Sequence, residues 1–287
     1  MSVRYRTDRH SKLDQRERDN LQAGCHMSRI PENLGPSQNH LLSSVSGEDY
    51  DRLLPHLCPV KLSLGSVVGD SNGHFGFAYF PTTCVVSLIC AMENGATAEV
   101  ALTGNDGVLG TSLFLGGNTT TSRAVVGIAG EALRMEAKVL KDQFMRGGTF
   151  QRVLLRYTEA LITQISLTAA CNRMHTLEKR LCRWLLLIRD RATSDELIMT
   201  QEFIANMLGG RRETVTVAAG HLQDAGLIHY TRGRLRIVNR KGLESTVCEC
   251  YRAVRSDGNR MLAEKNMGTR HCLRGSPCRT RVSNVLS

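Results

Sequence analysis

The sequence predicts an α+β protein whose strands and helices lie in separate parts of the chain. Between residues 60 and 140, short apolar runs alternate with turns rich in Gly and Asn, which is typical of a β-sandwich or barrel. Residues 150–174 change to the apolar spacing of a long helix. Residues 200–238 combine two short helices, a Gly turn and a hairpin, which indicates a winged helix-turn-helix.

The N-terminal part begins with a polar, charged segment that has Pro31 and Pro36 near its end, and we expect residues 1–38 to be a flexible leader. A short helix from Gly47 to Leu54 leads to Pro55. Five strands are then expected, separated by turns such as Gly104-Asn105-Asp106-Gly107: Ala78–Phe80, Val85–Ala91, Ala98–Leu102, Ala124–Ile128 and Ala132–Met135.

The long helix is expected from about Phe150 to Met174. Its apolar stripe is close to a heptad repeat and contains Leu154, Tyr157, Leu161, Ile165 and Thr168. Such a stripe is more often part of a core than an interface with a partner. In the next helix, Trp184 is expected in the core with Leu181, Leu185 and Ile188.

The helix-turn-helix is predicted from the order of its parts. Thr200 can cap a first helix whose apolar residues are Ile204, Met207 and Leu208. Ala205 is small where a second helix must cross closely, and Gly209-Gly210 permits a tight turn. The second helix places Val215, Ala218, Ala219 and Leu222 inward and exposes Arg211, Arg212, Glu213, Thr214 and Thr216. Such a helix can enter the DNA major groove.

A wing is predicted directly after this second helix. Gly226 is suited to end the helix in the left-handed conformation. Leu227–Tyr230 and Leu235–Val238 are strand-like runs around the turn Thr231-Arg232-Gly233-Arg234. An Arg-rich hairpin tip suits a DNA phosphate.

From Leu41 to Tyr251 the sequence resembles the Crp/Fnr superfamily of bacterial transcription regulators. Besides the segment above, the resemblance rests on four further segments: Leu53-Leu54-Pro55-His56-Leu57, Ala170-Cys171-Asn172-Arg173-Met174-His175, residues 177–186 and Lys241-Gly242-Leu243-Glu244. It implies a jelly-roll barrel like the cyclic-nucleotide-binding domain, a long dimerisation helix and a C-terminal winged helix-turn-helix.

The resemblance sharpens the domain organisation. After the leader we expect an effector barrel in residues 39–148, a dimerisation helix in 149–175, a DNA-binding domain in 176–254, and a basic, disordered tail in 255–287. It implies a homodimer that binds a palindromic site on double-stranded DNA, and RNA polymerase as a partner.

Residue roles also follow from the resemblance. Arg212 would contact guanine or phosphate, and Glu213 would accept a hydrogen bond from a cytosine amino group. Val217 occupies the position of the family's second Arg, so the half-site should differ from the usual one. Arg211 stands where a capping Ser is common and suits a phosphate. Glu213 can equally be a favourable charge in the first helical turn. The complete predicted DNA-binding set is Thr200, Gln201, Arg211, Arg212, Glu213, Thr214, Thr216, Val217, Arg232 and Arg234.

Charge supports a nucleic-acid partner, and no segment indicates a membrane. The net charge is +10, and residues 176–287 hold 20 Lys and Arg against 11 Asp and Glu. Such a region attracts the phosphate backbone, although basic surface can also serve solubility. The apolar runs fall short of the ~20 residues that span a bilayer, and no signal peptide is evident. We therefore expect a cytoplasmic protein whose ten cysteines are mostly reduced.

The candidate effector pocket contains Thr111, Ser112 and Arg123. Cyclic-nucleotide-binding members of the family have a Glu for the ribose and an Arg for the phosphate. Here Arg123 is in place but Thr111 replaces the Glu, and Arg123 can equally be structural. We therefore expect no tight binding of cyclic AMP, and the effector stays open.

The cysteines do not predict a cofactor. Cys25, Cys58, Cys84 and Cys90 are poorly spaced for an iron–sulfur cluster. A second set, Cys248-x-Cys250 with His271, Cys272 and Cys278, contains zinc-type ligands, but unliganded thiols are preferred. Neither a metal nor haem is expected.

The sequence has none of the phosphate-loop, zinc-protease or serine-hydrolase motifs, so no catalytic residues and no enzyme activity are expected. The alternative function is a ligand or redox sensor that acts through protein partners, binds a cyclic nucleotide or a metal, and uses its winged helix as an interaction module.

Overall fold

The computed structural model describes residues 38–70, 75–117, 120–192, 194 and 196–263, and within these no helix is long and apolar enough to cross a membrane. Two short helices and a 3₁₀ turn come first: α2 (His40–Ser43), α3 (Gly47–Leu53) and η4 (Leu54–His56). Seven strands and a 3₁₀ turn follow: β1 (Cys58–Leu62), β2 (Val67–Gly69), β3 (Phe77–Pro81), β4 (Val85–Ala91), β5 (Thr97–Thr103), η5 (Thr111–Leu113), β6 (Arg123–Ile128) and β7 (Gly130–Glu136).

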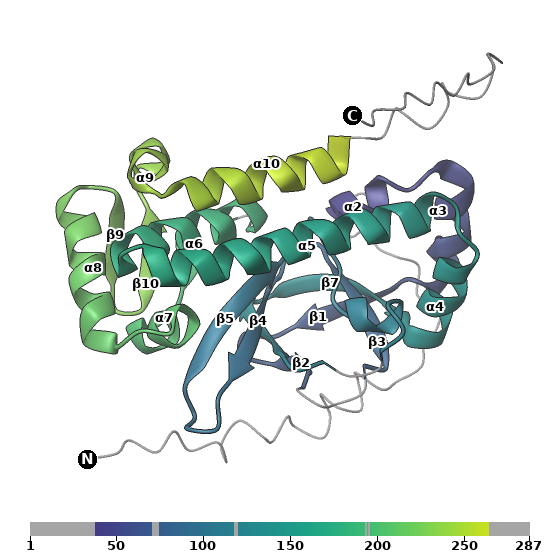
Figure 1. The fold of residues 1–287 in the computed structure, drawn as a ribbon, viewed down its shortest axis with the longest axis horizontal. Helices are drawn as coiled ribbons and strands as arrows, with labels where there is room; N and C mark the ends of the chain where they lie inside the picture. The colour runs from purple at the N-terminus through teal and green to yellow at the C-terminus, as the bar shows by residue number, and fades with distance from the viewer. Residues whose placement is uncertain (1–37, 71–74, 118–119, 193, 195, 264–287) are drawn as a thin grey trace, which may run out of the picture.

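These strands form two antiparallel sheets, ordered β1-β7-β3 and β2-β6-β4-β5 (Figure 1). The chain changes sheet between β1 and β2, between β2 and β3, between β3 and β4, and between β6 and β7. Phe80 and Leu133 of the first sheet share one buried core with Val86 and Val126 of the second. This arrangement confirms the predicted jelly-roll domain.

All five predicted strands are present with ends shifted by at most two residues. Strands β1 and β2 were not predicted from the sequence. Pro59 within β1 argues against a strand, but it lies on a strand that pairs on one side only, with β7, where a missing N–H is tolerated. Strand β2 has only three residues, too few to show alternation.

The long helix is α5 (Gly148–Met174), which follows α4 (Ala137–Met145) and lies along the β-domain (Figure 1). Leu154, Tyr157, Leu161 and Thr168 are buried as predicted. Ile165 is 37% exposed, so its expected place on the buried stripe was wrong. Gln164, one residue earlier, is buried instead, so Ile165 is rotated about 100° from it and lies at the edge of the buried face.

Helix α6 (Leu177–Arg191) begins the C-terminal domain. Thr176 caps it by accepting a hydrogen bond from the Lys179 N–H. Its core positions include Trp184, which is buried with its predicted neighbours. The rest of the domain is β8 (Glu196–Ile198), α7 (Gln201–Leu208), α8 (Arg212–Asp224), β9 (Ile228–Thr231), β10 (Arg234–Ile237), α9 (Arg240–Thr246) and α10 (Glu249–Ala263).

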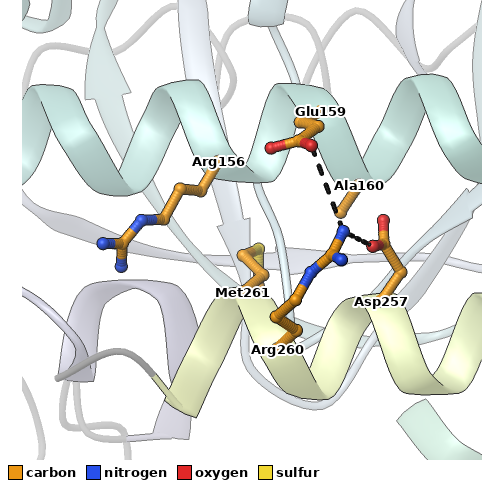
Figure 2. A pocket seen from close by; sticks show the side chains of 6 residues that line it. All are labelled: Arg156, Glu159, Ala160, Asp257, Arg260 and Met261. Carbon is orange, nitrogen blue, oxygen red and sulfur yellow. Dashed lines mark hydrogen bonds and ion pairs between the residues drawn. The ribbon is translucent and has the colours of Figure 1, made fainter.

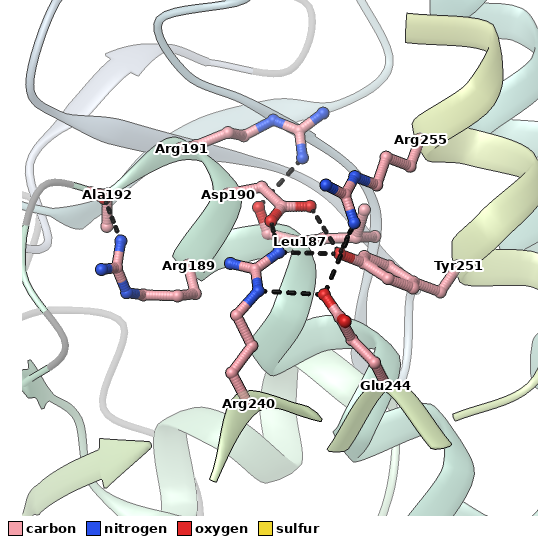
Figure 3. A network of polar contacts seen from close by, with 9 residues as sticks. All are labelled: Leu187, Arg189, Asp190, Arg191, Ala192, Arg240, Glu244, Tyr251 and Arg255. Carbon is pink, nitrogen blue, oxygen red and sulfur yellow. Dashed lines mark hydrogen bonds and ion pairs between the residues drawn. The ribbon is translucent and has the colours of Figure 1, made fainter. Parts of the chain in front are cut away.

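A polar network joins α6, α9 and α10 (Figure 3). Arg240 contacts Asp190 of α6 and donates from Nε to Glu244, 2.9 Å away. Tyr251 donates its hydroxyl to the second Asp190 oxygen at 3.0 Å. Arg255 lies 3.4 Å from the same Glu244 carboxylate. These contacts fix the start of α10 to α6 and α9.

Helix α10 corrects the expected boundary of the basic tail. The helix continues to Ala263, so residues 255–263 are ordered helix, whereas 264–287 lie outside the described residues. It runs back along α5, where Val254 and Met261 are buried (Figure 1). Arg260 contacts Asp257 and lies 4.0 Å from Glu159 of α5 (Figure 2). The sequence prediction missed this helix because packing against α5, rather than composition, stabilises it.

The β-domain and α6 meet at two buried polar contacts. Glu99 of β5 accepts a hydrogen bond from the Trp184 indole N–H at 3.0 Å. Arg191 of α6 is held by Asp106, with an Nη2–Oδ2 distance of 2.7 Å, and its Nη1 donates to the Leu187 carbonyl at 3.0 Å. Burial raises the pKa of Glu99 to about 7, although Ser87, Trp184 and the arginines 183 and 191 oppose this shift.

Glu99→Gln is expected to remove a pH dependence of stability. Because the folded-state pKa is raised, Glu99 retains its proton longer when the protein is folded than when it is unfolded. Its contribution is therefore complete below about pH 4.5 and is lost as the pH rises to about 7. Between pH 4.5 and 8 we expect the wild type to lose about 2–3 kcal/mol relative to the variant. Urea unfolding followed by Trp184 fluorescence measures this, and parallel pH profiles would contradict it.

Candidate DNA-binding interface

Helix α7 forms as its sequence predicts. The Thr200 hydroxyl accepts a hydrogen bond from the Phe203 N–H at 3.1 Å, which caps the helix. Ile204, Met207 and Leu208 are buried, as expected for the stripe that faces the domain core. The cap and the buried stripe together fix the angle at which α7 supports α8.

The turn between α7 and α8 depends on glycine. Gly209 has φ +59°, the left-handed conformation that an L side chain rarely adopts. The Gly210 N–H donates back to the Ala205 carbonyl at 3.0 Å, so the turn stays tight. Ala205 is buried, in agreement with a close helix crossing.

Helix α8 presents one apolar and one polar face, as predicted. Val215, Ala218, Ala219 and Leu222 are all buried. After the last helical residue, Asp224, and the C-cap residue, Ala225, comes Gly226, whose φ is +68°. The Leu227 N–H donates to the Leu222 carbonyl at 2.9 Å and the Gly226 N–H to the Gln223 carbonyl at 2.8 Å, which is a Schellman motif.

The exposed face of α8 gathers at its N-terminal end. The predicted residues Arg211, Arg212, Glu213, Thr214 and Thr216 are all exposed there. Val217 is 57% exposed on the same face, so an apolar side chain is available to solvent in the first turns of the helix. Arg211 occupies the N-cap position without a side-chain cap, which leaves its guanidinium uninvolved in the helix start.

Gln201 and Thr216 connect the two helices. The Thr216 hydroxyl lies 2.8 Å from Gln201 Oε1 and 3.0 Å from the Arg212 carbonyl. A hydroxyl has one proton, so it donates to one of the two at a time. Both residues were predicted to contact DNA. In this structure the hydroxyl also orients the Gln201 amide at the start of α7.

The wing is a three-stranded antiparallel sheet ordered β8-β10-β9. The two-residue turn between β9 and β10 contains Arg232 and Gly233, with φ of +47° and +78°. Two positive φ values are the signature of a type I′ turn, which matches the strand twist. The predicted hairpin is therefore confirmed, with Arg232 exposed at its tip.

Arg234 differs from Arg232 in its surroundings. It lies within β10 and donates from Nη1 to Glu196 of β8 at 2.6 Å. Both partners are largely exposed, so the pair is weak in water and can rearrange. Arg232 is thus the better candidate of the two for a phosphate contact.

Two further exposed side chains on the outer face of the wing, Arg236 and His229, were not predicted. Arg236 is two residues beyond Arg234, and it lies opposite His229 in the register of β10 and β9. The alternation of Arg234-Leu235-Arg236-Ile237 could have identified Arg236, since side chains alternate across a strand.

The wing is also linked to the end of α8. The Gln223 amide oxygen accepts a hydrogen bond from the Tyr230 N–H at 2.8 Å and so fixes the wing to the end of α8.

The candidate effector residues do not form a nucleotide-type cradle among the described residues. Thr111 and Ser112 lie in η5. Arg123 of β6 instead forms an ion pair with Asp70, with an Nε–Oδ1 distance of 2.9 Å. Both side chains are largely exposed, so this pair is weak in water and does not by itself fix the role of Arg123. Residues 71–74 and 118–119 lie outside the described residues.

The cysteines gather differently from the sequence prediction. Cys248 and Cys250 lie beside Cys171 and His175 at the α5–α10 contact. Burial raises the pKa of the Cys171 and Cys250 thiols. Cys25, His271, Cys272 and Cys278 lie outside the described residues.

Comparisons with known proteins agree with this geometry. Residues 179–246 match the model of the Crp-like helix-turn-helix domain. No sequence match is found among the curated proteins. Several solved structures share the fold at low sequence identity.

In three such structures the matched region covers nearly the whole solved chain. The first, assigned to the Crp/Fnr family of transcriptional regulators from Eubacterium rectale, has a TM-score of 0.58 at 16% identity over 73% of this chain and 98% of its own. FixK2 from Bradyrhizobium japonicum gives 0.58 and 17% over 67% and 98%. The c-di-GMP-responsive regulator CLP from Xanthomonas campestris gives 0.52 and 15% over 67% and 99%.

Proposed function

We propose that this chain, which carries a Crp-like helix-turn-helix domain within the fold of the Crp/Fnr regulators, is a sequence-specific transcription regulator that binds a palindromic DNA site as a dimer. The observation that carries the proposal is the exposed polar N-terminal end of α8 together with the exposed Arg232 at the tip of the wing. A capped, buried α7 holds this surface in place.

The exposed face of α8 offers a defined set of base contacts. Arg212 can donate two hydrogen bonds to one guanine, and Glu213 can accept from a cytosine amino group. Val217 can contact a thymine methyl but cannot donate. The half-site should therefore contain guanine and cytosine at two positions and differ from the usual family site at the third. Arg211 and Arg232 suit the phosphates on either side.

Dimerisation would use the outward face of α5. Leu155 is 46% exposed and Ile162 59% exposed, and Ile165 lies on the same side. Positions 155, 158, 162, 165, 169 and 172 alternate in steps of three and four, the spacing of a coiled-coil seam. Exposed apolar side chains at this spacing are best covered by a second copy of α5, and the dimer axis would place two α8 helices on one palindrome.

The effector and the wider partners belong to this proposal as well. The β-domain would be the effector domain, with an effector other than cyclic AMP, because Thr111 stands where cyclic-nucleotide-binding members of the family have the Glu that binds the ribose. RNA polymerase would be contacted at the promoter, with no enzyme activity in the chain.

Arg212→Ala and Arg232→Ala should separate base contacts from phosphate contacts. The first is expected to relax the preference at one base position and weaken specific binding by about 5- to 150-fold, the equivalent of a lost bidentate contact. The second should weaken binding equally for all sequences and reduce its salt dependence. Selection of binding sites from random DNA, with titrations at several salt concentrations, measures both.

Arg146→Ala is the matched control, because Arg146 is exposed at the end of α4. It should leave both the selected motif and the affinity unchanged. An unchanged motif for Arg212→Ala would refute its assignment. The alternative sensor function, acting through protein partners, would be favoured if the wild type showed no sequence preference and no salt dependence.

A further inference from the structure

Three cysteines and one histidine converge where α5 ends and α10 begins. Cys171 lies in the last turn of α5 and His175 is its C-cap residue, whereas Cys248 precedes α10 and Cys250 is its second residue. Their Sγ and imidazole nitrogen atoms all lie within 4.8 Å of one another. We call these four residues the Cys3His cluster.

The spacing of the Cys3His cluster matches a tetrahedral metal ion. Cys171 Sγ and Cys248 Sγ are 3.7 Å apart, and Cys250 Sγ is 3.8 Å from His175 Nδ1. Bonds of about 2.3 Å to sulfur and about 2.1 Å to nitrogen give a tetrahedron with edges of about 3.8 and 3.6 Å. These two separations agree with the expected edges, and the remaining ones stay within 4.8 Å, so a contraction of about 1 Å or less would close the cluster around one ion.

We propose that the Cys3His cluster is a structural zinc site. Three thiolates and an imidazole are a ligand set that selects Zn²⁺ over Mg²⁺ or Ca²⁺, which prefer oxygen. The protein supplies all four ligands, so no position stays open for water or substrate. The three cysteines are buried and His175 is nearly so, which makes the site closed and structural rather than catalytic.

The surroundings of His175 support zinc independently of the ligand spacing. While Nδ1 faces Cys250, Nε2 lies 3.4 Å from a Glu249 carboxylate oxygen. A histidine that binds zinc through one nitrogen commonly donates its other N–H to a carboxylate, which fixes the ring and strengthens the ligand. Glu249, between Cys248 and Cys250 in the sequence, is placed for this role.

The local charge is also suitable. Zinc with three thiolates carries one net negative charge. Arg183 of α6 is buried, donates from Nη1 to the Thr168 hydroxyl at 3.1 Å and lies close enough to Cys171 to act on it electrostatically, as does Arg180. A buried anionic site flanked by guanidinium groups is far less costly than an isolated one.

A disulfide explains less of this geometry. The 3.7 Å between Cys171 and Cys248 far exceeds a sulfur–sulfur bond of about 2.05 Å. A disulfide would also use only two of the four residues, and it would not explain why Cys250 Sγ faces His175 Nδ1. A zinc ion uses all four, and it ties the end of α5 to the start of α10.

Metal analysis of the full-length chain tests the proposal. Protein purified under reducing conditions, incubated with zinc sulfate and freed of excess metal should retain about one zinc per chain. Replacement by cobalt(II) should give the visible absorption bands of a tetrahedral thiolate site. Chelation should lower the melting temperature, because a metal that binds only the folded state stabilises it.

Variants locate the ion. Cys250→Ser and Cys171→Ser should lose most of the retained zinc, and Glu249→Ala should weaken zinc binding by about tenfold in a chelator competition. Cys182→Ala is the matched control, since Cys182 is buried in the same core but is not part of the cluster. It should keep its zinc.

Two results would overturn the proposal. One is a wild type that retains less than about a tenth of an equivalent and gives no thiolate–cobalt bands. The other is zinc that remains in Cys250→Ser but is lost in Cys182→Ala. The cobalt spectrum needs no variant, so a variant that fails to fold leaves the test intact. Because the site is independent of DNA contacts, its failure would not affect the proposed function.

Discussion

Ile162→Glu is expected to give a monomer that no longer binds its palindrome tightly. Ile162 and Leu155 are exposed on the outward face of α5 at the heptad spacing described above. At a two-fold seam each substitution places two carboxylates together and removes buried apolar surface from both copies. The dimer should dissociate at micromolar concentration, as sedimentation velocity measures.

The loss of the dimer should also lower affinity for the full palindrome by more than about 100-fold, since two linked half-sites bind far more tightly than one. Leu64→Glu is the matched control. Leu64 is 49% exposed in the β-domain, so this change has the same chemistry away from α5 and should leave a dimer. If Ile162→Glu still sediments as a dimer, the α5 seam is not the interface.

Asp106→Ala is expected to lower the free energy of unfolding by about 3 kcal/mol. Arg191 is 8% exposed, and its guanidinium contacts Asp106, Gln164 and a backbone carbonyl. Removing Asp106 leaves this charge buried without a carboxylate at the contact between the β-domain and α6. The carboxylate is partly solvated, which places the cost at the low end of the range for buried pairs.

Urea unfolding monitored by the single Trp184 measures this effect where it arises, because Trp184 lies in the same contact between domains. The double variant Asp106→Ala with Arg191→Met should lose less than the sum of the two single changes, since no unpaired charge remains. Asp142→Ala, at the surface of α4, is the control and should cost little. Additive losses would show that the pair is not coupled.

Helices α7 and α8 and the wing, which form the candidate DNA-binding surface, could be predicted from the sequence because their signals are local. Thr200, Gly209, Gly226 and the Arg232-Gly233 turn each act within a few residues through caps and positive φ values. The same is true of the alternation in β9 and β10. Chemistry and spacing within one segment were enough to place α7, α8 and the wing.

Contacts between distant segments could not be predicted in this way. Cys171 and Cys248 are 77 positions apart, and Arg191 and Asp106 are 85 apart. Closeness along the chain therefore grouped Cys248 and Cys250 with the Cys and His residues of the tail, whereas packing of α10 on α5 brings them to Cys171 and His175. The helical continuation beyond Arg255 was missed for the same reason.

Because α5 is long, a small rotation at one end produces a large displacement at the other. At 27 residues it is about 40 Å long, so a tilt of about 5° at the β-domain would displace its far end by about 3–4 Å. That displacement exceeds the tolerance of a hydrogen bond between a side chain and a base edge. Since α6 follows the end of α5 directly, a small tilt of α5 in the proposed dimer would decide whether the two α8 helices fit successive turns of a DNA duplex.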